Sequence, residues 1–440
     1  MYIKSLKLEK VKGFSNLDFN FQRPDGSFAG WTVFVGGNAS GKSTILKCIA
    51  LAVMGPDAGR QLLGVPTGWI QDGANRASAS VAIMRDPSVD TFSPKGRPTD
   101  QFNAEVRWQM DKQDAVPVFR AAPLPKNART GPPQRGPWNE QASGWFCAGY
   151  GPMRRLTGSS SESMRYSVGG IESLFVTLFR EDAALSESEV WLKTNHSRWL
   201  ENRQNTELKH LLDSVSELLG DGLLPLGMKI SKLSVDHVYL RDSSNIELPM
   251  RDISDGCRSI YATVLDIIHN MYEIYGVKDL FGYTQKGSIV IQKPGVVLID
   301  EIDAHLHPSW QRDVPEWFKR HFPRVQFFVT THSPLVTQAA DENGVFWLPS
   351  HADSDAQARP LEARELERLR LGRAEKTLLG TAFGLDSSRS SWANKRIETW
   401  KRLNAKAKAG VALTATENKD LKKLKEQMEI AFESNTEGGL

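Results

Sequence analysis

Residues 36–44 have the types and spacing that bind phosphate. They read Gly-Gly-Asn-Ala-Ser-Gly-Lys-Ser-Thr and match the pattern G-x-x-x-x-G-K-S without a mismatch. Glycines let the backbone approach phosphate oxygens, while Lys42 can reach the β- and γ-phosphates and the Ser43 hydroxyl can ligate Mg²⁺. The residues expected to hold the nucleotide here are Gly36, Asn38, Gly41, Lys42, Ser43 and Thr44. The alternative is a chance Gly-rich turn, which would not require the strand and helix patterns on either side.

Two carboxylates and a histidine further along the chain could complete this chemistry. Residues 295–301, Gly-Val-Val-Leu-Ile-Asp-Glu, read as a buried strand that ends in two acids, which is typical of a Walker B motif. Asp300 would bind Mg²⁺ through water, and Glu301 would polarise the attacking water. His332 follows a second apolar run that starts at Val325. By itself, a histidine at a strand end is usually structural.

The residues around the glycine-rich loop predict the elements that position it. Residues 31–35 are apolar and β-branched or aromatic, as in a buried strand, and the chain from Ser43 onward reads as a helix. Alternation of apolar and polar residues over 6–21 predicts a hairpin ahead of the loop. Similar alternation at 77–83 and 102–110 predicts an antiparallel sheet beside the nucleotide core.

The middle of the chain predicts a loop followed by a helical lobe. Residues 111–143 carry six prolines, too many for a helix or a central strand, so we expect a long surface loop. Its basic residues could touch nucleic acid, but a solvated loop is the simpler interpretation. A second polar loop is expected at 159–163. Helical spacing then predicts apolar faces at Ile171, Leu174, Phe175, Leu178 and Phe179, and at Leu208, Leu211, Leu212, Val215, Leu218 and Leu219.

The bulk composition places few limits on function. The 440 residues are 40% hydrophobic and 24% charged, which is typical of a soluble globular protein. No window approaches the ~18 apolar residues of a membrane span, and charges at the start do not suit a secretory signal, so a cytoplasmic location is expected. Three cysteines in no C-x-x-C spacing imply neither a disulfide framework nor a zinc site. A net charge of +3 does not argue for nucleic-acid binding by itself.

Residues 254–256, Ser-Asp-Gly, precede a strongly amphipathic helix. Alone they are only a plausible N-cap. Placed between the glycine-rich loop and the Walker B strand, they resemble the signature motif of ATP-binding-cassette (ABC) ATPases. That resemblance implies that Ser254, Asp255 and Gly256 cap the γ-phosphate of ATP held by another subunit. It also implies that His332 is a switch histidine that hydrogen-bonds the γ-phosphate.

Three features are more similar to the RecF, SMC and overcoming-lysogenisation-defect group of ATPases than to transporter cassettes. They are Lys-Gly-Phe at 12–14, Asp-Glu-Ile-Asp-Ala-His-Leu-His-Pro at 300–308, and Thr-Thr-His-Ser-Pro at 330–334. Within this group, residues 149–155, the stretch 173–192 and residues 383–390 resemble the small PtuA-like ATPases of bacterial anti-phage systems, Septu and the PtuA-bearing retrons. The resemblance covers residues 1–350 closely and the tail loosely.

The sequence departs from the pattern of this group in two places. No glutamine can be assigned as the Q-loop residue, for which the turn at 149–155 is the candidate position. After His332 the chain lacks the acidic clusters on strands that a TOPRIM nuclease needs for two metal ions. His305 and His307 suggest metal binding, but the group has its D-loop there, so contacts between subunits are the preferred interpretation.

The sequence of the tail predicts helices, and two roles for them are considered. Residues 361–371 form a charged helix, and a last helix begins near Thr414, with Glu417 completing a capping box. Its apolar stripe would be Leu421, Leu424, Met428 and Phe432. Such a tail could dock a partner or fold back onto its own core.

We therefore expect an α/β fold: a P-loop ABC-type ATPase head with a flanking antiparallel sheet, a mainly helical lobe and a helical C-terminal tail. Residues 1–110 would form the N-terminal part of the core with Walker A, and 111–250 the basic loop and helical lobe. Residues 251–350 would hold the signature, Walker B, D-loop and histidine, and 351–440 a partner-docking region.

The expected function is Mg²⁺-dependent ATP hydrolysis, with a turnover that can be slow, by a homodimer or higher homo-oligomer that closes around ATP. This ATPase would regulate a separate effector, such as an HNH nuclease, in anti-phage defence. One alternative is a RecF-like repair or recombination ATPase that binds DNA directly. A transporter cassette ranks far lower because its Walker B, D-loop and histidine motifs have other forms, and no membrane contact is expected.

Overall fold

A computed structural model describes residues 1–92, 99–110, 117–123, 131–156, 169–234, 237–349 and 356–433. The chain forms two compact units. The first comprises residues 1–377 and 381–383, and the second comprises 378–380 and the chain from Gly384 onward. The polar loop expected at 159–163 lies outside the described residues.

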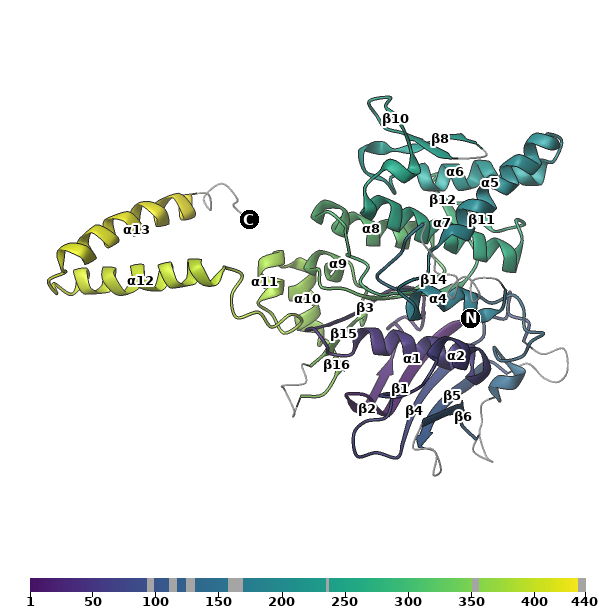
Figure 1. The fold of residues 1–440 in the computed structure, drawn as a ribbon, viewed down its shortest axis with the longest axis horizontal. Coiled ribbons are helices and arrows are strands. Elements are labelled where there is room, and N and C mark those ends of the chain that lie inside the picture. Colours follow the sequence, from purple (N-terminus) through teal and green to yellow (C-terminus); the bar gives the residue numbers. More distant parts are fainter. Residues whose placement is uncertain are drawn as a thin grey trace. The chain divides into compact units, whose positions relative to one another are not determined.

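A six-stranded sheet forms the centre of the first unit (Figure 1), in the order β16-β15-β3-β14-β13-β7. The five strands from β15 to β7 run parallel, and only β16 is antiparallel to its neighbour. Side chains on both faces of β13 and β14 are buried, which explains their continuous apolar runs. The strands are β3 (Gly30–Gly36), β7 (Cys147–Tyr150), β13 (Gly295–Ile299), β14 (Val325–Thr330), β15 (Val345–Leu348) and β16 (Arg359–Pro360).

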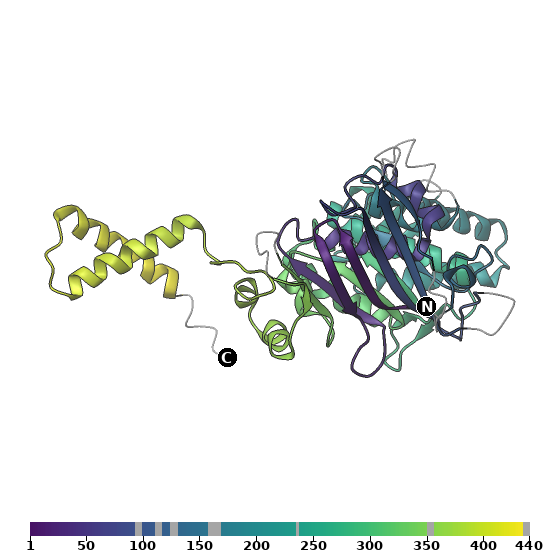
Figure 2. The same ribbon diagram turned by 90° about the horizontal axis from the view of Figure 1, so that it is seen from below.

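A five-stranded antiparallel sheet flanks this core, in the order β2-β1-β4-β5-β6 (Figure 2). Its buried face packs with α1 (Lys42–Met54) in one hydrophobic cluster that also includes Phe34 and Phe328 of the central sheet. The side chain of Gln326 joins the two sheets by accepting from the N–H of Ile3 and donating to its carbonyl. The strands are β1 (Tyr2–Val11), β2 (Phe14–Asn20), β4 (Arg76–Met84), β5 (Gln101–Met110) and β6 (Pro117–Ala121).

The expected hairpin and the two alternating strands are confirmed, but the long loop is interrupted. Residues 117–121 form β6, an edge strand, and Pro133–Arg135 form a single 3₁₀ turn. Pro117 is tolerated because it is the first residue of an edge strand. Residues 111–116 and 124–130 of the expected loop lie outside the described ranges.

Helices pack on the opposite face of the central sheet. α7 (Asp255–Tyr275) contacts α5 (Ser186–Glu201) and α6 (Thr206–Gly220), and α8 (Pro308–His321) joins the same hydrophobic cluster. The single helix face expected at 171–179 is wrong, because a 3₁₀ segment η2 (Ile171–Phe175) gives way to the short α4 (Val176–Phe179). Phe175 has a non-helical ψ of 0° at the junction.

Short strands accompany these helices and were not expected. They form the three-stranded sheet β8 (Lys229–Leu233), β9 (Val238–Arg241) and β10 (Glu247–Pro249), and the pair β11 (Phe281–Tyr283) and β12 (Ile289–Ile291). Four further helices are α2 (Pro56–Leu63), α9 (Pro334–Gln338), α10 (Ala363–Leu371) and α11 (Ala374–Leu378).

The second unit is a pair of helices, α12 (Ser391–Lys408) and α13 (Ala415–Glu433). Leu403 and Leu424 are buried in it, and the capping box between Thr414 and Glu417 is formed. The side chain of Phe432 lies outside the described residues. No helix in the described ranges combines the length and apolar character needed to cross a membrane. The parallel core, flanking sheet, helical lobe and helical tail confirm the expected fold class.

Candidate nucleotide-binding site

Four loops follow the carboxyl ends of neighbouring parallel strands in the central sheet. The glycine-rich loop follows β3, Thr331 to Ser333 follow β14, Asp300 to Asp303 follow β13, and Gly151 to Arg155 follow β7. In open α/β sheets, ligands bind at this edge. The topology therefore brings together the motifs that the sequence separates by up to three hundred positions.

The glycine-rich loop has a backbone that only small residues allow. Gly41 has φ 92°, in the left-handed region that favours glycine, directly before α1. A Cβ at this position would lie 2.5 Å from the ring of Phe14, so Phe14 packs against the loop. Residues 37–39 are exposed, and nothing lies within 4 Å of a Cβ built on Gly37. The loop is thus open on the side where the helix N-terminus favours an anion.

Lys42 points back into this loop. Its Nζ donates to the carbonyls of Gly36 and Gly37 at 2.9 and 2.8 Å, and only 7% of the residue is exposed. Burial lowers the pKa of Lys42, whereas the charges of Asp300 and Glu301 raise it. The lysine and the two carboxylates thus lie close enough to interact electrostatically.

The residues present fit a nucleoside triphosphate with Mg²⁺. The Ser40 hydroxyl is buried in the loop and has no hydrogen-bond partner among the described residues. An unpaired buried hydroxyl is costly, and a phosphate oxygen would be a suitable acceptor for it. Ser43 and Asp300 offer the hard oxygen ligands that Mg²⁺ prefers. Bound there, the cation would neutralise phosphate charge.

The hydroxyl of Thr330 contacts both Walker B residues, the side chain of Asp300 and the backbone of Glu301. Thr330, at the end of β14, donates to Oδ1 of Asp300, and its oxygen accepts the N–H of Glu301 at 2.8 Å. Asp300 is 4% exposed, whereas Glu301 is half-buried and has φ 47°. A left-handed backbone in a non-glycine residue is uncommon and often marks a functional site. No role was assigned to Thr330 from the sequence. Its position, a polar residue at the end of an apolar strand run, could have pointed to it.

Asp303 organises the segment that carries His332. Its carboxylate accepts from the Thr331 hydroxyl at 2.6 Å and from the N–H of His332 at 3.3 Å. The His332 residue itself is exposed at the edge of the site. The structure thus fixes the backbone of the predicted switch histidine through an acid of the D-loop.

The signature residues lie at the N-terminus of α7, with Ser254 and Asp255 exposed. Arg258 pairs with Asp255, and this hydrogen bond lowers the pKa of Asp255. Gly256 is buried, and a Cβ there would lie 2.3 Å from the carbonyl oxygen of His305. Within the described ranges, no hydrogen bond or ion pair joins 254–256 to 36–44. The signature therefore packs on its own D-loop rather than on its own phosphate loop.

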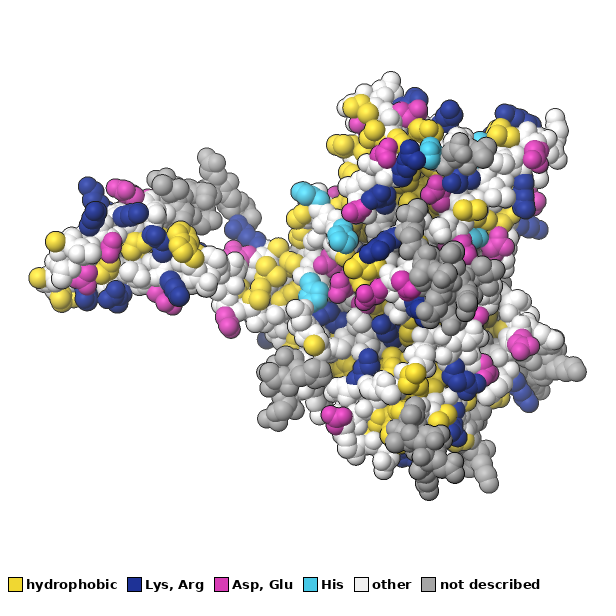
Figure 3. Space-filling view, in the orientation of Figure 1, with side chains coloured by type: hydrophobic (Ala, Val, Ile, Leu, Met, Phe, Trp, Pro, Cys, Tyr) yellow, Lys and Arg dark blue, Asp and Glu magenta, His cyan; other side chains and the backbone are white. Residues whose placement is uncertain are grey.

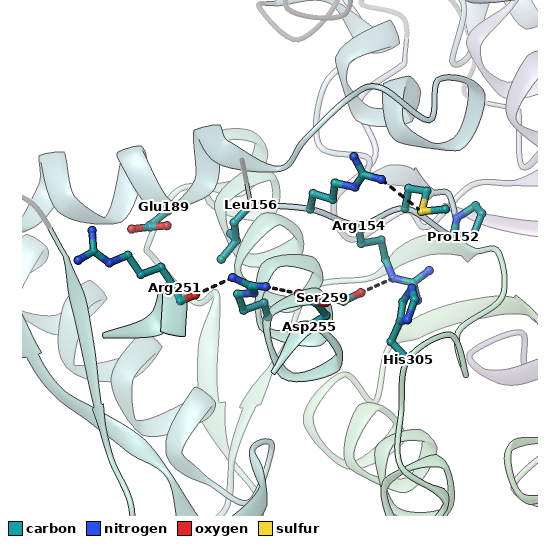
Figure 4. Close-up of a pocket in the computed structure, with 11 residues that line it drawn as sticks. Pro152, Arg154, Leu156, Glu189, Arg251, Asp255, Ser259 and His305 are labelled. Carbon is teal, nitrogen blue, oxygen red and sulfur yellow. Dashed lines mark hydrogen bonds and ion pairs between the residues drawn. The ribbon is translucent and has the colours of Figure 1, made fainter. Parts of the chain in front are cut away.

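A pocket of about 390 Å³ is lined by the turn after β7 and by the first turns of α7, including Asp255 of the signature (Figure 4). Its lining includes Arg154, Arg155, Arg251, Arg258 and His305. The other histidine considered for metal binding, His307, instead accepts the N–H of Ser309 at the start of α8. In the part of the chain that the structure describes, no group of three or more His, Cys, Asp or Glu side chains could hold a metal ion.

Two family models match the chain. Residues 5–87 match an AAA domain, and residues 196–337 match an AAA domain described as a putative AbiEii toxin of a type IV toxin–antitoxin system. Together these regions contain the phosphate loop, the signature, both Walker B acids and His332. The crystal structure of an SMC head bound to the C-winged helix domain of ScpA is 15% identical, with a TM-score of 0.45, covering 79% of this chain and 94% of that one.

Known proteins match over different shares of their length. The Septu protein PtuA of Bacillus thuringiensis is 31% identical over 401 residues, covering 89% of this chain and 86% of that protein. The Septu protein PtuA of Bacillus mycoides KBAB4 is 23% identical over 363 residues, 81% of this chain but 41% of that protein. The retron Ec83 probable ATPase of Escherichia coli is 34% identical over 123 residues, 28% of this chain and 20% of that protein. The match thus spans less than half the length of the last two.

Proposed function

This chain belongs to the family of Septu PtuA proteins, and from that premise we propose that it is a cytoplasmic, Mg²⁺-dependent ATPase of anti-phage defence. The observation that carries the proposal is that Lys42, Asp300 and Glu301 all follow the carboxyl ends of parallel strands, at one edge of the central sheet. The name of the E. coli relative as a probable ATPase supports it.

Each residue has a role that its surroundings support. Lys42 and the backbone of the phosphate loop hold the phosphates, while Ser43 and Asp300 hold Mg²⁺. Glu301 polarises the attacking water, for which its partly exposed side chain is suited. His332 contacts the γ-phosphate from the segment that Asp303 fixes.

We propose that ATP is enclosed between two copies of this chain. Ser254 and Asp255 are exposed at a helix N-terminus, a place that favours phosphate, yet they make no hydrogen bond to the phosphate loop of their own chain within the described ranges. A second protomer arranged head to tail would bring its signature to that loop. Hydrolysis would then remove the shared γ-phosphate and let the dimer open.

We propose that this ATPase cycle controls another protein. We propose that residues 351–440 dock a separately encoded effector, such as an HNH nuclease, and that ATP-dependent closure restrains or activates it. The compact second unit, which lies within this range, supports a docking role. Copurification of the effector with the whole chain, and its loss on deletion of α12 and α13, tests this part.

The exchange Glu301→Gln tests the ATPase proposal. We expect ATP affinity to stay within about twofold while turnover falls by about 10²–10⁴-fold, as for loss of a general base. In gel filtration with ATP and Mg²⁺ this variant should elute as a dimer, and without ATP as a monomer. Glu316→Gln, on the exposed face of α8, is the matched control and should behave as the wild type. Full turnover by Glu301→Gln would refute the assignment.

One feature of the second unit favours direct nucleic-acid binding as a second candidate function. α12 carries six basic residues and one acid, and Lys and Arg side chains spread over the surface of this unit (Figure 3). Trp392 on this helix is 64% exposed, with the Arg396 guanidinium 4.7 Å from its ring centre. Basic and aromatic side chains together suit single-stranded nucleic acid. Binding of the isolated chain to labelled DNA should then weaken steeply as salt rises.

A further inference from the structure

We propose that Arg154 is a positioning residue that holds the Walker B acids and the signature helix in one fixed arrangement. It lies in the turn after β7, where the sequence offers no Q-loop glutamine. The inference rests on the proposed function and extends it, because it names the residue that links ATP hydrolysis to the signature within one chain.

The contacts of Arg154 come from three separate elements. Its Nη1 donates to the carbonyls of Asp300 and Gly151, both at 2.7 Å, and its Nη2 donates to the carbonyl of Glu301 at 3.1 Å. Its Nε donates to the hydroxyl of Ser259 on α7 at 3.0 Å (Figure 4). Only 4% of Arg154 is exposed. A single planar guanidinium thus joins the end of β13 to the first turns of α7.

Arg154 donates to backbone carbonyls that lie beyond the end of β13. β13 ends at Ile299, and beyond it the N–H of Asp300 still donates to the carbonyl of Tyr150 at 2.8 Å. The carbonyls of Asp300 and Glu301 leave the sheet ladder, and Arg154 supplies hydrogen bonds to both. The Glu301 carbonyl also accepts the N–H of Ala304 at 3.0 Å. These two carbonyls flank the left-handed backbone of Glu301. A strained conformation persists only where its surroundings hold it, so Arg154 directs the carboxylate that polarises water.

The charge of Arg154 is retained in this buried position. Burial lowers its pKa to about 10, and the carboxylates of Asp300, Asp303 and Glu301 act in the opposite direction. An arginine side chain stays protonated at neutral pH. A lysine would keep the charge, but it lacks the rigid fork that reaches three directions at once.

A second contact makes the connection to α7 rigid. The Tyr150 hydroxyl donates to Oδ2 of Asp266 at 2.8 Å, while Arg154 binds Ser259. Ser259 and Asp266 are seven residues apart on α7, which is two helical turns, so both lie on one face. A shift of the Walker B end would therefore move α7 as a body, together with the signature residues at its N-terminus.

The exchange Arg154→Lys tests this role in the full chain. We expect the thermal midpoint and the affinity for ATP to stay near the wild-type values, because the phosphate loop is untouched. The turnover number should fall about 10–100-fold, as for other residues that orient a metal site from behind. Arg155→Lys is the matched control, since Arg155 is exposed, lines the same pocket and should tolerate the change.

The exchange Ser259→Ala tests the contact of Arg154 with α7 apart from its contacts with the carbonyls after β13. It removes only the hydrogen bond to α7, so ATP binding should persist while ATP-dependent dimerisation weakens. Wild-type turnover and dimerisation in Arg154→Lys would overturn the proposal, as would a loss of thermal stability and ATP binding in parallel. If the wild type does not hydrolyse ATP, the proposed function is refuted but the Arg154 proposal is not. In that case the ATP-dependent dimerisation of the two variants, compared with that of the wild type, decides the role of Arg154.

Discussion

The hydroxyl of Thr330 donates a hydrogen bond to the carboxylate of Asp300, so a residue at the end of one strand orients the acid that follows the neighbouring strand. The same hydroxyl accepts the N–H of Glu301. Thr330 is fully buried. Two acids that are adjacent in sequence are thus held by a side chain about thirty positions away.

The exchange Thr330→Val should reduce ATP turnover about 10–100-fold. Valine keeps the shape of threonine but leaves Asp300 free to rotate and the Glu301 N–H without an acceptor. Turnover at several Mg²⁺ concentrations checks this, and the apparent Mg²⁺ affinity should weaken. Thr330→Ser retains the hydroxyl and should keep most activity. Equal activity of the valine and wild-type proteins would show that Asp300 is positioned in another way.

The exchange Gly256→Ala should prevent ATP-dependent dimerisation while leaving ATP binding intact. The added Cβ would lie 2.3 Å from the His305 carbonyl, so the signature and the D-loop must move apart. Such overpacking costs about 1–3 kcal/mol of folding free energy, measurable by urea denaturation. Gly220→Ala, at the end of α6, meets only the Lys229 side chain and serves as the control. Normal dimerisation of Gly256→Ala would argue against a shared site.

The exchange Asp266→Asn should remove a loss of stability that occurs as pH rises. Burial, and secondarily the charge of Glu187, raises the pKa of Asp266 to about 7, although hydrogen bonds from Tyr150 and Asn270 oppose this. The unfolded chain releases this proton near pH 4 and the folded chain only near pH 7, so stability falls across that interval. Relative to wild type, the variant should gain about 1–3 kcal/mol between pH 4 and pH 8. Parallel stability profiles of the two proteins would contradict the prediction.

The exchange His269→Phe should change the pH dependence in the opposite direction. His269 stacks on Trp191 at 4.8 Å between ring centres, and burial lowers its pKa to about 4. The unfolded chain binds this proton near pH 6.5, before the folded chain does, so wild-type stability falls as pH drops from 6.5 to 4. Phenylalanine keeps the stacking without the proton. Thermal midpoints at pH 7 and pH 5 should therefore differ less in the variant than in the wild type.

The motifs at strand ends could be predicted because their signals are local. An apolar run followed by Asp300 and Glu301, or by Thr331 and His332, marks the carboxyl end of a buried strand within ten residues. Arg154 could not be predicted in this way. Its contacts lie 105 and 146 positions away, and only the fold brings Ser259 and Asp300 to it.

The errors in secondary structure have separate causes. The apolar spacing at 171–179 suits a helix, but the chain turns at Phe175 from a 3₁₀ to an α segment. The strands at 281–283 and 289–291 are too short for periodicity to reveal. α12 was not predicted from the sequence, although a serine before a helical stretch is a sequence signal for a helix start. The Ser390 hydroxyl caps this helix by accepting the N–H of Ala393.

The sheet order has a consequence for how the protein is made. β3 lies between β14 and β15, so both neighbours of the strand that precedes the phosphate loop come from the last third of the chain. β3 ends at Gly36, whereas β14 begins only at Val325. Such distant pairings form slowly. During synthesis, the loop leaves the ribosome long before Asp300 and Glu301 are made, so the strand that precedes it stays without either neighbour until the last third of the chain appears.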